Sequence, residues 1–438
     1  MRIANVENRI GSVTNKGLVA AELASIQRAL LMLVLLVWMI YSKTASCADW
    51  PQILGPNRDC VAAHEQVRRD WGKDRPRELW QREVGEGLAG VAVADGRAVL
   101  FHRLGNEQVV EAMDAESGKN LWEYRSPTGY VSTISPDSGP RCTPLIHDGA
   151  VYTHGADGQL TCLEMADGKL RWRRDTFVDF DVRQGYFGAG SSPVVAGELL
   201  LLNVGGRKQG GIVAFSLIDG ATVWHVPDEQ ASYSSPTLVE LDGARHALFV
   251  TRYNFLSLDP LTGKVRFRVP FGQRGPTVNA ATPIVVGNHV FVSASYGVGA
   301  RWIEIGKDGA EMVWSRDDLM SSQYATCVLK GDALFGIDGR QDGPPGSLRC
   351  FDPTDGSLHW SENNFGMATL IRAGDTLLVM KTDGELVLVD AKHKEYRELA
   401  RWLLLDGTAR ALPALADGRF YVRDETTLKC FDVGVEAD

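Results

Sequence analysis

Six polar side chains recur at one place in this sequence, immediately before or beside a pair of small residues. They are Arg141, Tyr233, Asn279, Gln323, Tyr324 and Arg410. Guanidinium groups bind carboxylates and phosphates, and tyrosine rings offer a flat apolar surface with a polar tip. If the fold brings these residues together, we expect a binding site for an anionic or aromatic ligand, or for a peptide. The alternative is that they only fill a solvated channel.

The sequence contains no recognisable catalytic or metal-binding motif. Its nine histidines form no His-x-His or His-Glu-x-x-His pattern, and no Cys/His cluster is present, so we expect no catalytic residues and no metal site. The glycine-rich run 205–211 could in principle cradle a phosphate. Because it lies between two expected strands and opens no helix, we predict a hairpin loop instead.

A repeated phrase predicts the elements that would position these side chains. A typical copy has an apolar residue, an acid, a glycine and then an aromatic residue four positions later, as in Leu163-Glu164 with Gly168 and Trp172. The acid can accept hydrogen bonds from the amides of a turn, and the glycine can adopt the positive φ near its end. The phrase therefore predicts a β-hairpin whose aromatic residue packs between neighbouring sheets.

The aromatic residues recur with a period that is typical of propeller blades. From Trp80 to Trp402 they are separated by 42 to 52 residues, although Tyr396 competes with Trp402 for the last position. Periods of this length with four strands each indicate a β-propeller. A small residue pair also recurs eight times, and we expect it to line a central channel because the inner strands crowd around one axis. The pairs begin at Ala89, Cys142, Ser191, Ser234, Ala281, Ala325, Ala368 and Ala411.

The two ends of the repeat region predict how the ring closes. Residues 77–84 carry a tryptophan strand with no preceding phrase, whereas residues 412–433 supply three strands and stop before a tryptophan strand. We therefore predict an all-β fold, an eight-bladed β-propeller of four-stranded antiparallel blades, in which the N-terminal strand joins the C-terminal three strands. Such closure removes free sheet edges. The expected propeller spans residues 77–433, after a leader at 49–76 and before a tail at 434–438.

The first 48 residues are typical of an export signal with a long n-region. Arg28 precedes an apolar stretch at 29–40, and small residues follow at 45–48. The apolar stretch is shorter than the roughly 20 residues that a membrane-spanning helix needs. We expect cleavage after Ala48 and a location in the periplasm or cell envelope. A retained membrane segment and lipidation of Cys47 are the alternatives.

The charge and the cysteines narrow the choice of partners and cross-links. Residues 1–48 hold five of the 46 Lys and Arg residues and two of the 55 Asp and Glu residues, so their removal leaves a net charge of −12. Such a surface repels phosphate backbones, and we expect no nucleic-acid partner. Cys162, Cys350 and Cys430 occupy the same place in their repeats, so we predict small core residues rather than disulfides. The partner of Cys60 stays open.

These repeats resemble the pyrroloquinoline quinone (PQQ) repeat family of propellers, whose repeats look like residues 258–264, Leu-Asp-Pro-Leu-Thr-Gly-Lys. Residues 50–58, Trp-Pro-Gln-Ile-Leu-Gly-Pro-Asn-Arg, look like the leader of PQQ-like propeller proteins of planctomycete-type bacteria. The resemblance covers about residues 50–433. The family includes calcium-dependent quinoprotein alcohol dehydrogenases, and also the outer-membrane assembly lipoprotein BamB, which binds no quinone and catalyses nothing. The resemblance therefore implies a fold but not one activity.

Two functional hypotheses follow from this resemblance. A PQQ-dependent dehydrogenase acting on alcohols or sugars would need an aromatic floor, Arg or Lys at the quinone carbonyls, a calcium ion held by carboxylate and amide oxygens, and an Asp base. The sequence has neither the adjacent cysteines of many such enzymes nor a Cys-x-x-Cys-His haem motif. We therefore favour a non-catalytic, cofactor-free, monomeric scaffold that binds an envelope protein or a small ligand. It would reach the membrane only through its signal or a lipid anchor.

Overall fold

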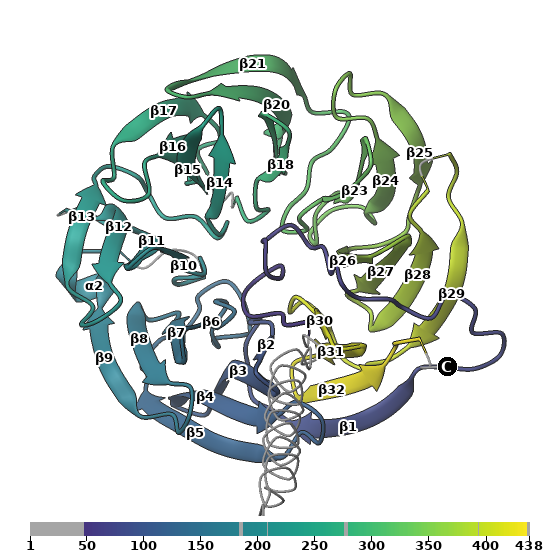
Figure 1. The fold of residues 1–438 in the computed structure, drawn as a ribbon, viewed down its shortest axis with the longest axis horizontal. Coiled ribbons are helices and arrows are strands. Elements are labelled where there is room, and N and C mark those ends of the chain that lie inside the picture. The colour runs from purple at the N-terminus through teal and green to yellow at the C-terminus, as the bar shows by residue number, and fades with distance from the viewer. Residues whose placement is uncertain (1–47, 184–186, 208, 276–278, 393, 436–438) are drawn as a thin grey trace, which may run out of the picture. The chain divides into compact units, whose positions relative to one another are not determined.

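Eight four-stranded antiparallel sheets surround a common axis in the computed structural model of this protein (Figure 1). Within each sheet, strands that follow one another in the chain are hydrogen-bonded neighbours, so each sheet is one blade. The predicted eight-bladed propeller is confirmed. The structure describes residues 48–435 except 184–186, 208, 276–278 and 393. The predicted signal segment, up to residue 47, and the predicted lipidation site Cys47 lie outside the described residues.

The strands of the blades have the following bounds, innermost strand first. Blade 1 consists of β2 (Ala92–Ala94), β3 (Arg97–Leu104), β4 (Glu107–Asp114) and β5 (Asn120–Pro127), and blade 2 consists of β6 (Leu145–His147), β7 (Ala150–His154), β8 (Gln159–Glu164) and β9 (Leu170–Asp175). Blade 3 consists of β10 (Val194–Ala196), β11 (Leu199–Gly205), β12 (Gly211–Ser216) and β13 (Thr222–Val226), and blade 4 consists of β14 (Thr237–Leu241), β15 (Ala244–Val250), β16 (Asn254–Leu258) and β17 (Val265–Pro270). Blade 5 consists of β18 (Ile284–Val286), β19 (His289–Ala294), β20 (Gly299–Gly306) and β21 (Gly309–Arg316), and blade 6 consists of β22 (Val328–Lys330), β23 (Ala333–Asp338), β24 (Ser347–Phe351) and β25 (Leu358–Glu362). Blade 7 consists of β26 (Ala368–Ala373), β27 (Thr376–Lys381), β28 (Glu385–Asp390) and β29 (Glu398–Leu403), and blade 8 consists of β30 (Ala414–Ala416), β31 (Arg419–Arg423), β32 (Thr427–Asp432) and β1 (Arg77–Glu83).

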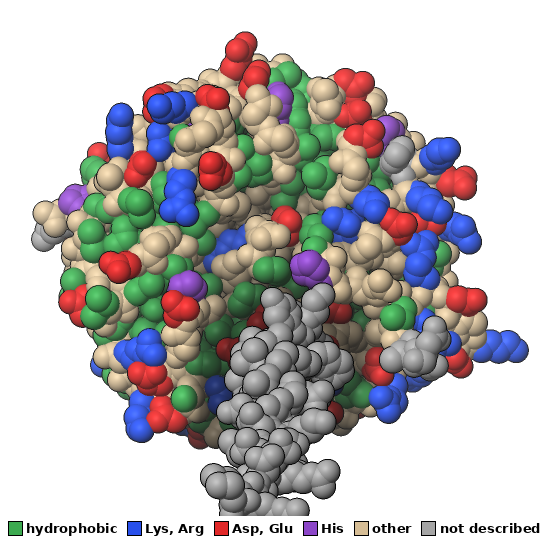
Figure 2. All heavy atoms as spheres, in the orientation of Figure 1, with side chains coloured by type: hydrophobic (Ala, Val, Ile, Leu, Met, Phe, Trp, Pro, Cys, Tyr) green, Lys and Arg blue, Asp and Glu red, His purple; other side chains and the backbone are tan. Residues whose placement is uncertain are grey.

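The one helix of the described chain is the short α2 (Thr176–Asp179), which follows β9. No helix of the described residues is long and apolar enough to cross a membrane. Figure 2 shows acidic and basic side chains interspersed around the outer part of one face of the ring. The outer strands are accordingly the more exposed ones, as in β21, whereas the strands nearer the axis are almost wholly buried.

The repeated phrase forms the turn between the third and fourth strands of a blade. In blade 1 the Asp114 carboxylate accepts the Ser117 amide at 2.8 Å, and Gly118 ends the turn with φ of 68°. A side chain at Gly118 would also collide with the Trp80 ring, because a Cβ there would lie 2.6 Å from it. Trp80 belongs to blade 8, so the glycine lets the tryptophan of one blade pack against the turn of the next.

The ring closes where the two ends of the repeat region meet. The N-terminal strand β1 pairs antiparallel with β32, and Trp80 lies opposite Cys430. Blade 8 therefore has the order β1-β32-β31-β30, with three C-terminal strands and one N-terminal strand. The predicted closure is confirmed, and β1 pairs with the outer edge of β32, which would otherwise be unpaired.

Side-chain hydroxyls of the small residue pairs link neighbouring blades around the axis. The Gly90 amide donates to Oγ1 of Thr143 at 3.1 Å, and the Ser192 amide donates to Oγ of Ser235 at 3.0 Å. A Cβ at Gly90 would lie 2.5 Å from the carbonyl oxygen of Leu412, across the seam between blades 1 and 8. Residues this close to the axis must be small, as the crowding argument requires.

Blade 7 departs from the repeat, and the predicted place of Trp402 is wrong. In other blades the aromatic residue lies opposite the residue two positions before the acid, as Trp172 lies opposite Cys162. In blade 7 that partner is Leu388, and Ala400 lies opposite it. Trp402 is two residues further along β29. Its indole Nε1 donates to the Asp74 carbonyl of the leader at 3.1 Å. Blade 8 has no turn between its third and fourth strands, because β32 and β1 come from opposite ends of the chain. The leader therefore takes the place of that turn beside Trp402.

Candidate functional site

The leader occupies the central channel. It begins beside blade 1, where Trp50 forms an antiparallel bridge with Val93, and the Pro51 carbonyl accepts the Ile146 amide of blade 2 at 2.8 Å. Figure 1 shows it passing through the centre of the ring and then outward past blade 7 to β1. The sequence predicted a segment before the propeller but gave no signal that it would enter the axis.

Arg58 anchors the leader inside the channel. Its Nη1 donates to the carbonyl oxygens of Pro236, at 2.9 Å, and of Ser192, and its Nη2 donates to that of Pro193. Its Nε donates to Oε1 of Gln52 at 2.8 Å. The side chain is buried, and burial lowers the pKa of the guanidinium to about 9. Within the described chain no carboxylate pairs with it, so carbonyl dipoles of blades 3 and 4 solvate the charge.

The outgoing part of the leader lies on the face where the innermost strands end. Val61 pairs in parallel with Arg372 of the innermost strand β26. The Glu65 carboxylate accepts the amides of Asp417 and Gly418, in the turn that follows the innermost strand β30. The innermost strands begin at the opposite face. Among the residues that the structure describes, the leader therefore fills the channel from one end and leaves the other mouth open.

A cavity of about 160 Å³ lies at this open mouth, which we call the mouth cavity. Five of the six predicted site residues line it, and Asn279 does not. Asn279 is buried behind the mouth, where its Nδ2 donates to the carbonyl oxygens of Thr251, at 2.9 Å, and Arg252. The lining consists of Ile53, Leu88, Ser135, Arg141, Phe187, Gly190, Tyr233, Ala280, Gln323, Tyr324, Arg410 and Leu412. None of these residues is acidic.

Two guanidinium groups give the mouth cavity a positive charge. Arg141 is held in place, because its Nη2 donates to the Asp137 carbonyl at 2.9 Å and its Nη1 donates to that of Gly139. Its Nη1 also lies 3.9 Å from the Asp137 carboxylate, an ion pair that offsets part of its charge. Burial lowers the pKa of Arg141, and the charge of Arg410 lowers it further. Arg410 lies over the Tyr324 ring at 6.0 Å and makes no hydrogen bond or ion pair within the described chain. Its charge is thus available to an anion from solvent.

The tyrosines of the mouth cavity are neutral and fixed. The Tyr233 hydroxyl accepts the Phe187 amide at 2.9 Å and retains its own proton to donate. The Tyr324 hydroxyl donates to Oε1 of Gln341 at 3.0 Å. Burial raises the pKa of both phenols to about 12. The Gln323 side chain is also engaged, since its Oε1 accepts a hydrogen bond from the backbone amide of Gln341 at 2.7 Å.

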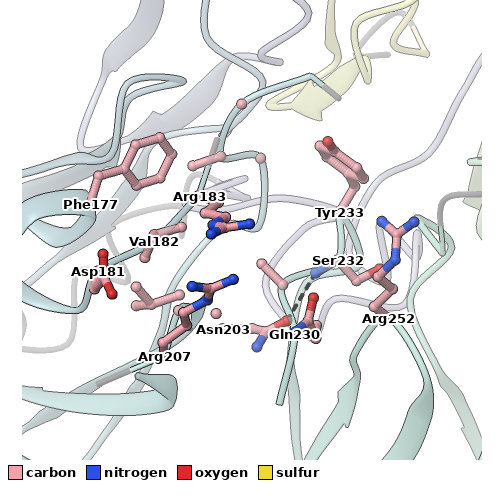
Figure 3. A pocket seen from close by; sticks show the side chains of 17 residues that line it. Phe177, Asp181, Val182, Arg183, Asn203, Arg207, Gln230, Ser232, Tyr233 and Arg252 are labelled. Atoms are coloured by element: carbon pink, nitrogen blue, oxygen red, sulfur yellow. Dashed lines mark hydrogen bonds between the residues drawn. The ribbon is translucent and has the colours of Figure 1, made fainter. Parts of the chain in front are cut away.

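A second cavity of about 310 Å³ shares Gly190 and Tyr233 with the first. Figure 3 shows the side chains that line this second cavity. We call it the arginine cavity, because Arg183, Arg207 and Arg252 line it. The glycine-rich run contributes to its wall and is the hairpin loop that was predicted, between the end of β11 and the start of β12. Sequence reasoning missed this cavity, because its arginines come from three separate connections.

The described lining of the two cavities is rich in guanidinium groups and contains one carboxylate, that of Asp181. No group of three His, Cys, Asp or Glu side chains that could hold a metal ion occurs in the described part of the chain. The six cysteines from Cys60 onward are buried and unpaired there, and burial raises the pKa of the Cys142 thiol to about 11. They are therefore poor nucleophiles.

This fold and these cavities define a class, the eight-bladed β-propellers of PQQ-like repeats. A family model described as "Outer membrane protein assembly factor BamB" matches residues 63–177 and 106–362, and the chain belongs to this family. The BamB protein of Burkholderia pseudomallei is 24% identical over 321 residues, which cover 70% of this chain and 75% of that protein.

Solved structures share the fold. The BamB structure from Moraxella catarrhalis has a TM-score of 0.59 at 15% identity and covers 82% of this chain and 100% of its own. A quinohemoprotein alcohol dehydrogenase from Comamonas testosteroni has a TM-score of 0.65 at 15% identity, covering 91% of this chain and 82% of its own. At these identities the likeness shows the propeller fold and no shared activity.

Proposed function

We propose that this protein is a non-catalytic propeller of the cell envelope that binds an anionic group of a partner at the mouth cavity. The observation that carries the proposal is the lining itself, which combines Arg141 and Arg410 with two neutral tyrosines and contains no carboxylate. A carboxylate or phosphate entering this cavity meets hydrogen-bond donors and the unpaired charge of Arg410, whereas Arg141 already lies 3.9 Å from the Asp137 carboxylate. The described part of the same lining contains no Asp, Glu or His side chain that could act as a general acid or base.

The relatives support an envelope location and a protein partner. The Burkholderia pseudomallei and Xanthomonas campestris relatives are named outer membrane protein assembly factors. We propose the periplasm or cell envelope for this chain as well, as a monomer that meets an envelope protein. The open mouth is the end of the channel that a partner can reach, because the leader fills the other end.

A bound quinone does not fit the mouth cavity. A PQQ site needs an aromatic floor, a cation held by carboxylate and amide oxygens, and an Asp base. Here the leader places Ile53 in the lining, next to the aliphatic Leu412, and no lining residue is acidic. The volume of about 160 Å³ is also below the roughly 300 Å³ at which ligand pockets begin. We therefore propose a function without PQQ and calcium.

Two experiments test the proposal. Purified protein supplied with PQQ and calcium should not reduce a dye with a panel of alcohols and sugars, and robust turnover would refute the non-catalytic function. Crosslinking in envelope extract should capture a partner with the wild type. An Arg410→Glu variant should lose that partner, because Arg410 is charged, accessible and without an ion pair, whereas Arg173→Glu on the outer strand β9 should retain it. Equal capture by both variants would place the partner elsewhere.

A further inference from the structure

We infer that the arginine cavity binds a small organic anion that carries carboxylate or phosphate groups. This is a second site, beyond the mouth cavity and independent of the partner proposed for it. Arg183 precedes blade 3, Arg207 lies in the β11–β12 loop and Arg252 lies beyond β15. Figure 3 shows the Arg183 and Arg207 side chains entering the cavity from one side and Arg252 from the other.

The charges in this cavity are unbalanced. Arg183 and Arg207 form no hydrogen bond or ion pair through their side chains within the described chain, and Asp181 is the one acidic residue among the lining residues. Asp181 forms no ion pair there either. Like charges that share one cavity repel each other, so an anion that bridges them lowers the electrostatic energy of the site.

The backbone around the arginines is held by specific contacts. The Arg207 amide donates to the Phe180 carbonyl at 3.1 Å, and Gly206 packs so tightly against the same carbonyl that a side chain would not fit. Arg252 donates through Nη2 to the Gly275 carbonyl at 2.6 Å and through Nε to the Tyr253 hydroxyl. The backbone at Arg207 and the guanidinium of Arg252 are therefore held in position, which reduces the entropy lost when a ligand binds.

The size and the walls of the cavity favour an organic anion over a bare inorganic one. Its volume of about 310 Å³ reaches the lower end of ligand pockets, roughly 300 to 1,000 Å³. Phe177, Val182 and the Tyr233 ring supply apolar wall, and the Tyr233 hydroxyl supplies a donor. An occupant with two or more anionic groups on a short carbon or sugar skeleton would engage both the arginines and this wall.

Titration calorimetry of the mature protein with citrate and with pyrophosphate tests the site and distinguishes carboxylate from phosphate ligands. We expect binding of at least one probe, with an affinity that falls as salt rises. The double variant Arg183→Gln/Arg207→Gln should weaken it about tenfold or more, because two charge-assisted contacts are lost. Arg207→Lys keeps the charge but loses the planar fork, so its affinity should lie between wild type and Arg207→Gln.

Control variants separate this site from the mouth cavity and from general charge effects. Arg173→Gln should bind the probes as the wild type does, Arg410→Gln should leave the binding that depends on Arg183 and Arg207 unchanged, and circular dichroism should show that all variants are folded. The inference is overturned if neither probe binds at millimolar concentrations, or if the double variant binds equally well. Binding of a poly-glutamate peptide but of neither probe would assign the cavity to an acidic polypeptide and overturn it too. None of these outcomes would change the result of the partner-capture experiment with Arg410→Glu, so the proposed function and this inference can fail separately.

Discussion

The Arg58 guanidinium donates to the carbonyl oxygen of Pro236 at 2.9 Å, a contact between residues 178 positions apart. It joins the leader to the start of blade 4, while the other bonds of Arg58 reach blade 3. A segment outside the repeat thus ties the centre of the ring together.

Replacing Arg58 by alanine should destabilise the protein by about 3 kcal/mol, because it leaves buried carbonyl oxygens without donors. Urea unfolding followed by tryptophan fluorescence measures this loss. Arg173→Ala, on the exposed outer strand β9, is the matched control and should change little. Equal stabilities of the two variants would mean that the leader does not stabilise the channel.

Replacing Gly118 by alanine should cost more stability than replacing Gly149. Both glycines have positive φ, 68° and 67°, so both substitutions strain the backbone by about 1 kcal/mol. Only at Gly118 would the new Cβ meet the Trp80 ring, at 2.6 Å, whereas nothing lies within 4 Å of a Cβ at Gly149. We expect a difference of about 2 kcal/mol in thermal or urea unfolding. Similar losses would show that the tryptophan moves aside freely.

The contact between Trp71 and Trp402 should be measurable as a coupling energy. The two rings meet edge to face with centroids 5.1 Å apart. Trp71→Ala should destabilise the protein by about 3 kcal/mol, because Trp71 is buried in the core of blades 7 and 8. In a double-mutant cycle with Trp402→Ala, the interaction should be about 1 kcal/mol. Additive losses would contradict the proposed role of the leader in replacing a turn.

Stability should fall in mild acid because of His154. This side chain is buried on β7, its Nε2 lies 3.2 Å from Oγ1 of Thr176, and burial lowers its pKa from 6.5 to about 4. Between these values the unfolded chain takes up a proton that the folded protein does not. The free energy of unfolding therefore decreases as pH falls through this window, and His154 accounts for about 3 kcal/mol of the decrease.

Urea unfolding at several pH values measures this slope. His154→Gln should make it shallower, whatever its effect on stability at neutral pH, and the remaining slope should come from groups such as His102, whose pKa burial lowers to about 3. His225→Gln, an exposed histidine on β13, should leave the slope unchanged. A slope that is the same in His154→Gln and in the wild type would assign the acid sensitivity to other groups.

The sequence by itself determined the architecture. The turn from Asp114 to Gly118 depends on residues a few positions apart, and the same chemistry recurs at a regular spacing, so both the hairpins and the number of blades could be predicted. Closure followed from which strand was missing at each end. The location of Arg141, Tyr233, Tyr324 and Arg410 at one mouth followed in turn, because equivalent positions of a ring meet at its axis.

Only the tertiary structure decided what lies on the axis and between the blades. Nothing local in the sequence shows that Arg58 enters the channel, that Asn279 turns back to hold Thr251, or that Ala400 takes the place expected for Trp402. The arginine cavity likewise joins three connections that share no motif. The physical reason is that turns and strand spacing depend on near neighbours in the chain. The position of a side chain at a crowded axis depends on tertiary contacts such as that between Arg58 and Pro236, 178 positions apart, which no period encodes.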